Sequence, residues 1–457
     1  MYKNCLSRIT FFTFFLMFNL FFTACKKYLD VKSDQKLSIP STLEDFQALM
    51  DGNTIMNTSY SSGAEMSNDN FYLIEETWKG LTNIPAKNLY IWEPVTTNRA
   101  DWTGQYRLIN QANLVLDNID NKVYDESQLA AYKKAKGAAL FFRSYGYFNL
   151  AVNFTQYWDS TNAINMPGLP LRLHSEILSP TVRTTLKETF DRIESDMLEA
   201  VQLLPVEVQF KTQPSKAACF AHMARVYLYK KQYQNALAAS NSSLSLYSQV
   251  IDYNSVDSTA AIPFQRMNAE VLLYTKISGG SSLSNSGTII DSNLYKLYEV
   301  SDLRKKLFFS KRSGEGYSFK GSYLAELTPV AFTGPTTAEV LLMKAECAVR
   351  LGDIQSALQA INLLLINRYR KNQFTPIAIQ DPDNLLKLIL DERRKELIFR
   401  GQRWADLKRL NTDSRFAITL KRVIGSLVYE LPPGDLRYTF LIPEDVIKMS
   451  GIVQNQR

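Results

Sequence analysis

Apolar residues recur at helical spacing in two long segments of the chain. From Phe220 to Leu228, apolar side chains stand at positions i, i+3, i+4, i+7 and i+8, which lie on one face of an α-helix. A turn at residues 230–232 separates this helix from a second one. Residues 338–365 repeat the arrangement around a turn at Gly352-Asp353. Each segment therefore predicts a hairpin of two antiparallel helices.

A small residue stands at matching places in both segments. Ala224 precedes Ala236 by twelve positions, and Ala345 precedes Ala357 by the same separation. Small side chains let two antiparallel helices approach closely, as in a tetratricopeptide hairpin. Two hairpins with the same spacing indicate helical-repeat architecture.

Two further segments have helical patterns, and two others do not. Residues 135–152 and 185–205 each predict one more helix, the second ended by Pro205. Residues 51–105 and 252–335 are rich in Ser, Asn, Thr and Gly, and their apolar clusters are too short for long helices. Long irregular stretches in a compact chain are usually functional loops or disordered. We therefore predict a loop-rich region that packs against a helical chassis.

Six consecutive charged residues, 391–396, interrupt an apolar pattern near the C-terminus. In a continuous helix, Ile389, Arg393 and Leu397 share one face, so the face that buries the two apolar residues also buries at least the stem of Arg393. A buried guanidinium requires carboxylate or carbonyl partners. We interpret the cluster as a structural network rather than a ligand site. The candidate partners of Arg393 are Asp391, Glu392, Glu396 or a group from another helix.

The first 24 residues have the pattern of a secretory signal. Lys3 and Arg8 precede an apolar run of about fourteen residues, which is shorter than a bilayer span. The run ends in Phe22-Thr23-Ala24-Cys25, and small residues before a cysteine fit the lipoprotein signal peptidase, although leucine is usual where Phe22 stands. We predict cleavage before Cys25 and acylation of Cys25, with palmitate among the attached chains, which would anchor the protein without a membrane span. The alternative is a cleaved signal with an accidental cysteine.

Composition excludes some classes of function. The formal net charge of +7 is spread over 457 residues without a basic run among stacking aromatics, so nucleic acid is not an expected partner. Once Cys5 and Cys25 are set aside, Cys219 and Cys347 remain, both in helical patterns. We expect buried free thiols and leave a disulfide between them open.

Catalytic and metal-binding motifs are missing from the sequence. The only two histidines are His174 and His222, and His222 neighbours an apolar helix stripe, which favours packing over metal binding. There is no zinc spacing of His or Cys, no G-x-S-x-G and no phosphate-binding glycine loop. Residues 381–384, DPDN, lack the full series of a calcium loop and predict a turn, although a structural calcium stays open. We predict a non-enzyme without cofactor, catalytic residue or metal.

Several segments together carry a resemblance to a known family. They are CKKYLDV after the cleavage site, NLYKLYEVSDLRKKLFF at 293–309, AEVLLMKAECAVRLGD at 338–353, DERRKELIFRGQRWADLKRL at 391–410 and the closing FLIPEDVIKMSGIVQNQR. In these segments the chain resembles the SusD/RagB family of outer-membrane nutrient-binding lipoproteins. Many members of this family have a glutamate at the position of Arg400. Any role of that glutamate in the family therefore does not apply to this chain.

The resemblance implies a mainly α fold in which four tetratricopeptide-like helical hairpins support a loop-rich, ligand-facing region. After a signal peptide at 1–24, we expect an N-terminal part at 25–250 and a C-terminal part at 251–457 within one compact mature unit.

The resemblance also implies a function and a partner. The family places such a protein on the outer membrane, lipid-anchored and facing the exterior. It would capture an oligosaccharide or peptide and deliver it to a SusC-like TonB-dependent barrel. Two alternatives are a helical-repeat scaffold lipoprotein for envelope assembly and a surface glycan-degrading enzyme.

Aromatic faces beside hydrogen-bonding side chains bind sugars and peptides in water. Of the aromatics in residues 70–107, we expect Trp102 and Tyr106 to face the core and Tyr90 and Trp92 to be half-buried. The candidate ligand residues are Tyr72 and Trp78 with Asn83 and Arg99 as donors, Tyr298 and Tyr317 in the later loops, and Trp158.

Overall fold

The computed structural model describes residues 40–176, 180–277, 283, 287–326 and 331–457. The signal peptide and Cys25 lie outside these residues. The chain divides into two units, Met1–Ser41 and Thr42–Arg457, and the description that follows concerns the second. Division of the mature chain at residue 250 stays a prediction. None of the helices in the described part combines the length and the apolar composition needed to cross a bilayer.

Both predicted hairpins are present. The first consists of α10 (Lys216–Tyr229) and α11 (Tyr233–Leu246), and the second of α14 (Thr337–Arg350) and α15 (Ile354–Leu365). The four matched alanines are all fully buried, because each lies where two helices approach closely. The mainly α fold is therefore confirmed, whereas a count of four tetratricopeptide-like hairpins stays a prediction.

The helices predicted at 135–152 and 185–205 are α8 (Leu129–Phe154) and α9 (Leu186–Leu203). A capping box between Thr185 and Glu188 begins α9. The long helix α7 (Arg99–Ile119) packs against α8, and a Cβ at Gly146 would lie 3.0 Å from Ile109 of α7, so glycine permits the close approach. The helix α2 (Leu43–Met50) packs on both.

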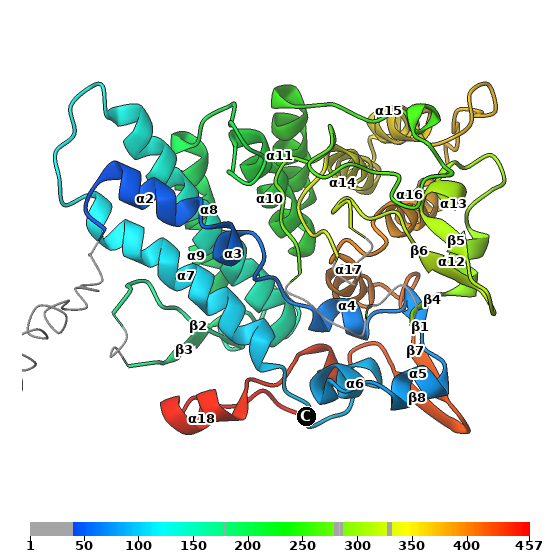
Figure 1. Cartoon of the computed structure of the whole chain (residues 1–457), viewed down its shortest axis with the longest axis horizontal. Helices are drawn as coiled ribbons and strands as arrows, with labels where there is room; N and C mark the ends of the chain where they lie inside the picture. The colour runs from blue at the N-terminus through cyan, green and yellow to red at the C-terminus, as the bar shows by residue number, and fades with distance from the viewer. Residues whose placement is uncertain (1–39, 177–179, 278–282, 284–286, 327–330) are drawn as a thin grey trace, which may run out of the picture. The chain divides into compact units, whose positions relative to one another are not determined.

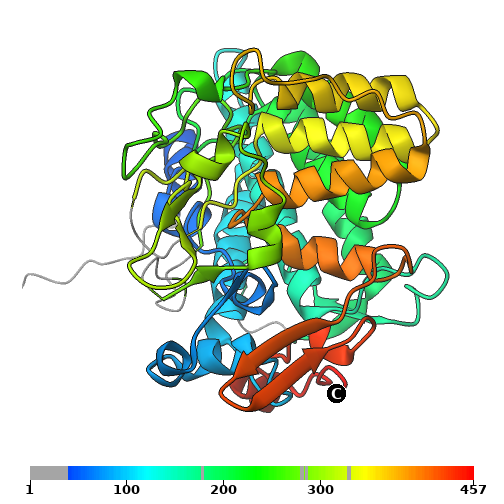
Figure 2. The ribbon, with the colours of Figure 1, turned by 90° about the vertical axis from the view of Figure 1, so that its right-hand side faces the viewer.

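The C-terminal part adds α16 (Pro382–Glu396), α17 (Arg403–Leu410) and α18 (Glu444–Ser450). Figure 2 shows α14, α15 and α16 side by side, in yellow and orange. Asp381 accepts a hydrogen bond from the backbone N–H of Asn384, so DPDN begins α16. This helix start replaces the predicted turn.

Where the structure describes the two irregular stretches, their elements are short, apart from the start of α7. These are α3 (Asn53–Met56), α4 (Gly63–Ser67), α5 (Glu75–Lys79), α6 (Ile84–Tyr90), η1 (Tyr253–Ser255), α12 (Ser292–Lys296) and α13 (Arg304–Leu307). A further short helix, η3, spans Leu436–Tyr438. The helical chassis and the loop-rich region are thus both present (Figure 1).

Strands in the described residues form four separate antiparallel pairs. They are β1 (Phe71–Tyr72) with β4 (Ile289–Ile290), β2 (Pro167–Pro170) with β3 (Arg183–Thr185), β5 (Phe309–Lys311) with β6 (Tyr317–Phe319), and β7 (Leu420–Ile424) with β8 (Leu427–Leu431). The pairing of β1 with β4 joins the two irregular stretches, which are far apart in sequence. The loop-rich region is therefore one continuous structure.

Candidate ligand-binding site and buried ion networks

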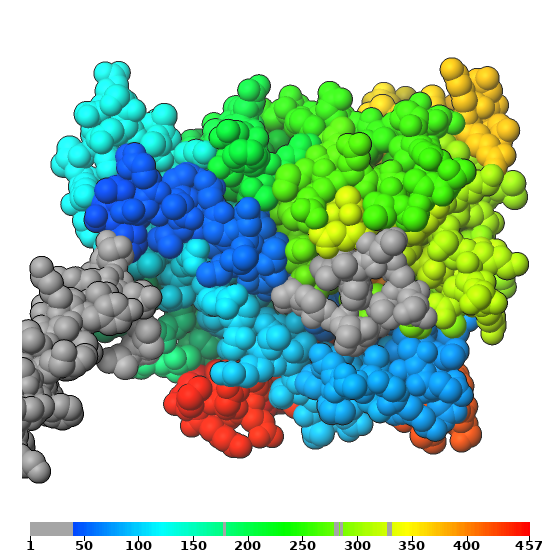
Figure 3. Space-filling model, viewed as in Figure 1, coloured from blue at the N-terminus to red at the C-terminus, as the bar shows by residue number. Residues whose placement is uncertain are grey.

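Two candidate ligand residues from distant segments lie together. Tyr72 of β1 pairs with Ile289 of β4, and β4 contacts β6, which begins at Tyr317. Gly316 has φ +76°, and a Cβ there would lie 2.5 Å from Ile289 Cγ2 and 3.8 Å from the Tyr72 hydroxyl. The tip of the β5–β6 hairpin therefore fits against Tyr72. In Figure 3 the surface of residues 70–95, in blue, lies directly below that of residues 290–320, in yellow-green.

A third tyrosine, which the sequence analysis missed, completes this group. The rings of Tyr295 and Tyr317 are stacked with centroids 3.9 Å apart and an interplanar angle of 14°. Both side chains are half-buried. We call Tyr72, Tyr295 and Tyr317 the tyrosine cluster. Half-exposed aromatic rings of this kind suit the apolar face of a sugar or a peptide side chain.

The hydroxyl groups of Tyr72 and Tyr295 stay protonated. Burial, followed by the hydrogen bond to Tyr317, raises the pKa of Tyr295. The pKa of Tyr72 is raised first by burial and then by Glu315, against the opposing effect of Arg312. A protonated tyrosine both donates and accepts hydrogen bonds, as recognition of sugar hydroxyls requires.

Tyr298 is not part of the ligand surface. Its side chain is 1% exposed, and its hydroxyl donates a 2.8 Å hydrogen bond to the backbone oxygen of Lys395. The chain turns after α12, so Tyr298 faces inward toward α16 while Tyr295 stays half-exposed. The segment contains both tyrosines, and the half-exposed Tyr295 rather than the buried Tyr298 packs against Tyr317.

Trp78 and Asn83 stabilise the α5–α6 turn. The Trp78 indole N–H donates a 3.0 Å hydrogen bond to the backbone oxygen of Lys87, whose ammonium lies 4.7 Å from the ring centre. The side-chain oxygen of Asn83 accepts from the N–H of Ala86 at the start of α6. Trp78 remains half-exposed, so part of its ring is open to solvent.

The other two candidates make contacts between helices. Arg99, at the start of α7, forms a 2.7 Å ion pair with Asp445 of α18. Trp158 packs edge-on against Phe190, and the Lys230 ammonium lies 4.3 Å from its ring centre. These contacts give both residues a structural explanation.

The remaining aromatics of residues 70–107 separate into core residues and one groove residue. Trp102 is buried as expected, whereas Tyr90 and Trp92 are fully rather than half buried, because both pack under Arg422 of β7. Tyr106 is half-buried and borders a groove of about 820 Å³ between α7 and α18. Other side chains that border this groove are Asn110, Arg172, Val182, Val446 and Met449.

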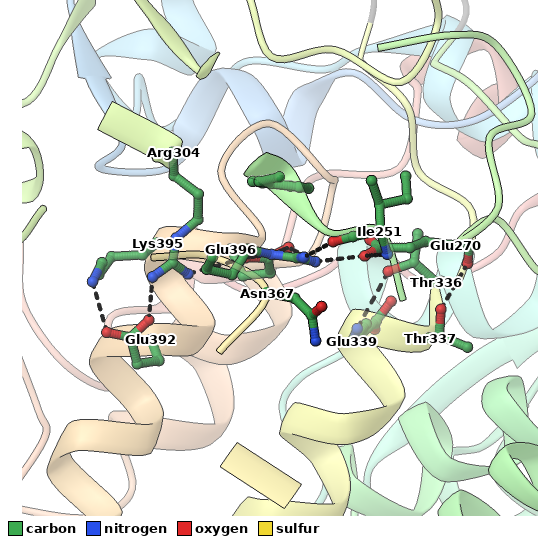
Figure 4. Close-up of polar contacts among 12 residues, drawn as sticks. Ile251, Glu270, Arg304, Thr336, Thr337, Glu339, Asn367, Glu392, Lys395 and Glu396 are labelled. Carbon is green, nitrogen blue, oxygen red and sulfur yellow. Dashed lines mark hydrogen bonds and ion pairs between the residues drawn. The ribbon is translucent and has the colours of Figure 1, made fainter. Parts of the chain in front are cut away.

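Glu392 and Glu396 lie in a buried ion network, which Figure 4 shows in close-up. Arg304 donates to Asp302, Glu392 and Glu396 at 2.6 to 3.0 Å, and its side chain is fully buried. Lys395 pairs with Glu392 at 2.6 Å and with Asp302 at 2.9 Å. This network joins α13 in the loop-rich region to the C-terminal end of α16.

The same network continues to a second loop. Arg368 donates to Glu396 at 2.9 Å and to Glu270 at 2.7 Å. It also donates to the backbone oxygen of Ile251 at 2.9 Å. Burial alone would raise the pKa of Glu396, but Arg368 and Arg304 outweigh it and hold the pKa below its usual value. Glu396 is therefore an anion shared by two arginines.

Arg393 belongs to a different network from Glu392 and Glu396. Its Nε donates to Asp406 of α17 at 2.9 Å, so another helix supplies the partner. Arg409 also donates to Asp406 and pairs with Glu346 of α14. Burial would raise the pKa of Asp406, but Arg393 and Arg409 lower it below its usual value. Glu392 and Glu396 are four residues apart and share one face of α16, whereas Arg393 is turned about 100° from Glu392, which explains the separation.

Possible metal ligands do not cluster. Among the described residues, no group of three or more His, Cys, Asp or Glu side chains could hold a metal ion. His222 is fully buried against Phe141, Tyr145 and Phe148, and burial lowers its pKa well below the usual value. Cys219 and Cys347 are both buried and free, so no disulfide joins them.

Comparison with known proteins identifies the family. Residues 27–228 match a SusD-like family described as starch-binding and associating with the outer membrane, and residues 337–423 match the SusD family. The chain belongs to the SusD/RagB family.

Individual relatives agree with this assignment. SusD-like protein P2 of Formosa agariphila is 24% identical over 428 residues, covering 78% of this chain and 79% of the relative. SusD-like protein P38 of the same organism is 37% identical over 84 residues, which cover 16% of each chain. The crystal structure of a SusD superfamily protein from Bacteroides thetaiotaomicron has a TM-score of 0.75 and 20% identity, covering 91% of this chain and 100% of that one. The likeness to this structure is one of fold.

Proposed function

We propose that this protein binds oligosaccharides outside the outer membrane and delivers them, without turnover, to a SusC-like TonB-dependent barrel. The matching family is described as starch-binding and associating with the outer membrane. The observation that carries the proposal is the tyrosine cluster. It supplies stacked, half-exposed rings and hydroxyl groups on the loop-rich region, which is the combination that sugar binding requires.

The test is calorimetric binding of the chain from Lys26 onward to panels of neutral and acidic oligosaccharides and to mixed peptides. We expect oligosaccharides to bind and Tyr317→Ala to weaken binding about three- to tenfold, because one stacked ring contributes about 0.5–1.5 kcal/mol beyond its area. Tyr132→Ala is the matched control, since Tyr132 is a half-exposed tyrosine of α8 whose hydroxyl is bonded to Asp120. Circular dichroism checks that both variants are folded.

Other results would point to other functions. Binding of peptides alone would replace the oligosaccharide in the proposal. Product formation from a bound glycan would indicate an enzyme. Binding of folded envelope proteins with no response to either panel would indicate a scaffold. Co-purification with a TonB-dependent barrel tests the delivery step separately.

Membrane attachment is proposed to depend on Cys25. Since the protein would be held by acyl chains on this thiol, Cys25→Ala should move it from the membrane fraction to the soluble fraction. Cys5→Ala, which changes a cysteine inside the proposed signal, is the control and should leave the distribution unchanged. Retention of the Cys25 variant in the outer membrane would contradict lipid anchoring.

A further inference from the structure

Two lysines flank the stacked tyrosines. The Lys305 ammonium lies 5.0 Å from the centre of the Tyr295 ring and donates a 2.7 Å hydrogen bond to the backbone oxygen of Tyr298. Lys311 stands directly across from Tyr317 in the β5–β6 pair. Directly paired residues on neighbouring strands have Cβ atoms about 4.5–5.5 Å apart, so Lys311 lies beside the Tyr317 ring.

Lys311, Tyr317 and Tyr295 lie on one face of the hairpin. Phe309 and Lys311 point to the same side of β5, and Phe319 and Tyr317 to the same side of β6, because side chains alternate along a strand. Tyr295 packs on this side, with its ring 5.4 Å from Phe309 and 3.9 Å from Tyr317. The opposite side carries the exposed pair Ser310 and Ser318.

The charge on this face is not neutralised by the neighbouring carboxylates. Within the described residues, neither Lys305 nor Lys311 forms an ion pair with Asp or Glu. Asp291 and Glu315 interact with Tyr72 instead, and Asp291 already lies 3.7 Å from Arg394. The tyrosine cluster therefore has two lysines beside Tyr295 and Tyr317, whereas Tyr72 has both acidic and basic neighbours, Glu315, Asp291 and Arg312.

We infer that the ligand of this site is an anionic glycan, in which a sugar ring packs on the tyrosine stack and its carboxylate or sulfate lies between Lys305 and Lys311. This inference rests on the proposed function and narrows its ligand class. Aromatic stacking holds neutral and acidic sugars alike, so the two ammonium groups would supply the discrimination between them.

The expected effects are moderate and depend on salt. A charge pair at the protein surface is weak because water screens it, so removal of one lysine should weaken binding of an acidic sugar by at most about fivefold. Screening shortens the Debye length from about 10 Å at 0.1 M to about 3 Å at 1 M ionic strength, so added salt should remove most of the preference.

The experiment compares tetragalacturonate with its methyl ester, which has the same backbone without charge, and with a sulfated galactose tetrasaccharide of equal length. The chain from Lys26 onward, Lys305→Gln, Lys311→Gln and the double variant are titrated at 50 mM and 500 mM NaCl. Lys306→Gln is the control, because it removes one exposed ammonium from the same helix, α13. The two acidic probes distinguish a carboxylate from a sulfate ligand.

Support would be tighter binding of an acidic probe than of the ester, a loss of that preference in the double variant, and an unchanged preference in the control. Equal binding of the ester and the acidic probes, or a preference that survives in the double variant, would overturn the inference and leave glycan binding itself intact. No binding of any glycan in the wider panel would overturn both.

Discussion

Glu65 and Lys408 are buried without an ion-pair partner within the described residues, and both form hydrogen bonds with the backbone. Glu65 of α4 accepts hydrogen bonds from Asn68 and from the backbone N–H of Gly401, and burial raises its pKa to about 7. Lys408 of α17 donates to the backbone oxygens of Val152 and Thr155 at 2.7 Å, and burial lowers its pKa to about 7. Each joins segments that are distant in sequence.

Protonation of Glu65 should make stability depend on pH. The folded protein binds this proton more tightly than the unfolded chain, whose glutamate has a pKa near 4.5, so this residue lowers the free energy of unfolding as the pH rises from about 4.5 to about 7. The loss approaches about 3 kcal/mol, at 1.36 kcal/mol per pKa unit. Glu65→Gln should remove this part of the pH dependence, measured by urea unfolding between pH 4.5 and 8.

The comparison with Glu65→Gln cancels the titration of Lys408 and other groups, which both proteins share. Glu76→Gln, at an exposed site on α5, controls for the loss of one carboxylate. Identical pH profiles for the wild type and Glu65→Gln would show that Glu65 titrates as an ordinary exposed glutamate.

At the scale of single elements, periodicity predicts where the helices lie, but it does not predict which side chains of other helices contact them. The face shared by Ile389 and Arg393 follows from residue spacing alone, and both side chains are buried in α16. The partner of Arg393 is Asp406 of α17, thirteen residues later, whereas the nearer Glu392 and Glu396 turn toward α13. Spacing within one helix carries no information on which other helix packs against each face.

Replacement of Arg393 should therefore affect folding and not ligand affinity alone. Arg393→Leu leaves Asp406 buried with one cation fewer, and loss of one partner of a buried ion pair costs about 3–5 kcal/mol. Thermal unfolding of the variant should begin well below that of the wild type. Lys387→Leu is the control on the same helix, since its pair with Asp391 is exposed and should contribute less than about 1 kcal/mol. A stable Arg393 variant that only binds ligand less well would contradict a structural role.

At the scale of the whole molecule, the sequence predicts the helical chassis and the presence of the loops. It does not predict which loop segments pair with each other. The helical hairpins are local, and their alanine spacing is visible in the sequence. The β1–β4 pair has two residues in each strand, too few for an alternating pattern, and its partners stand at positions 71–72 and 289–290. The tyrosine cluster depends on this pairing. The sequence therefore offers Tyr72 and Tyr317 only as separate candidates and gives no sign that Tyr295 lies beside them.

The buried network of Arg304, Arg368 and Glu396 links this closed loop region to the chassis. Arg304 stands in α13, directly before β5, and so supports the strand that carries Lys311 and faces Tyr317. Glu396 accepts hydrogen bonds from both Arg304 and Arg368. Arg368 in turn donates to Glu270 and to the backbone oxygen of Ile251. The loops around the tyrosine cluster thus share a buried ion network with the C-terminal end of α16.

Arg304→Met should consequently change stability and binding together. Methionine leaves Asp302, Glu392 and Glu396 with less positive charge in a buried site, so we expect a loss of about 3–5 kcal/mol in the free energy of unfolding. Limited proteolysis should cut within residues 296–320 before it cuts α14 or α15, because the network holds the loop and the helices pack independently of it.

Ligand affinity of Arg304→Met should also fall, because β5 is no longer held in place. Tyr317→Ala, in contrast, should lower affinity with stability nearly unchanged. If Arg304→Met kept full affinity despite cleavage in this loop, the ligand would bind outside the tyrosine cluster, and the groove beside Tyr106 would become the site to test.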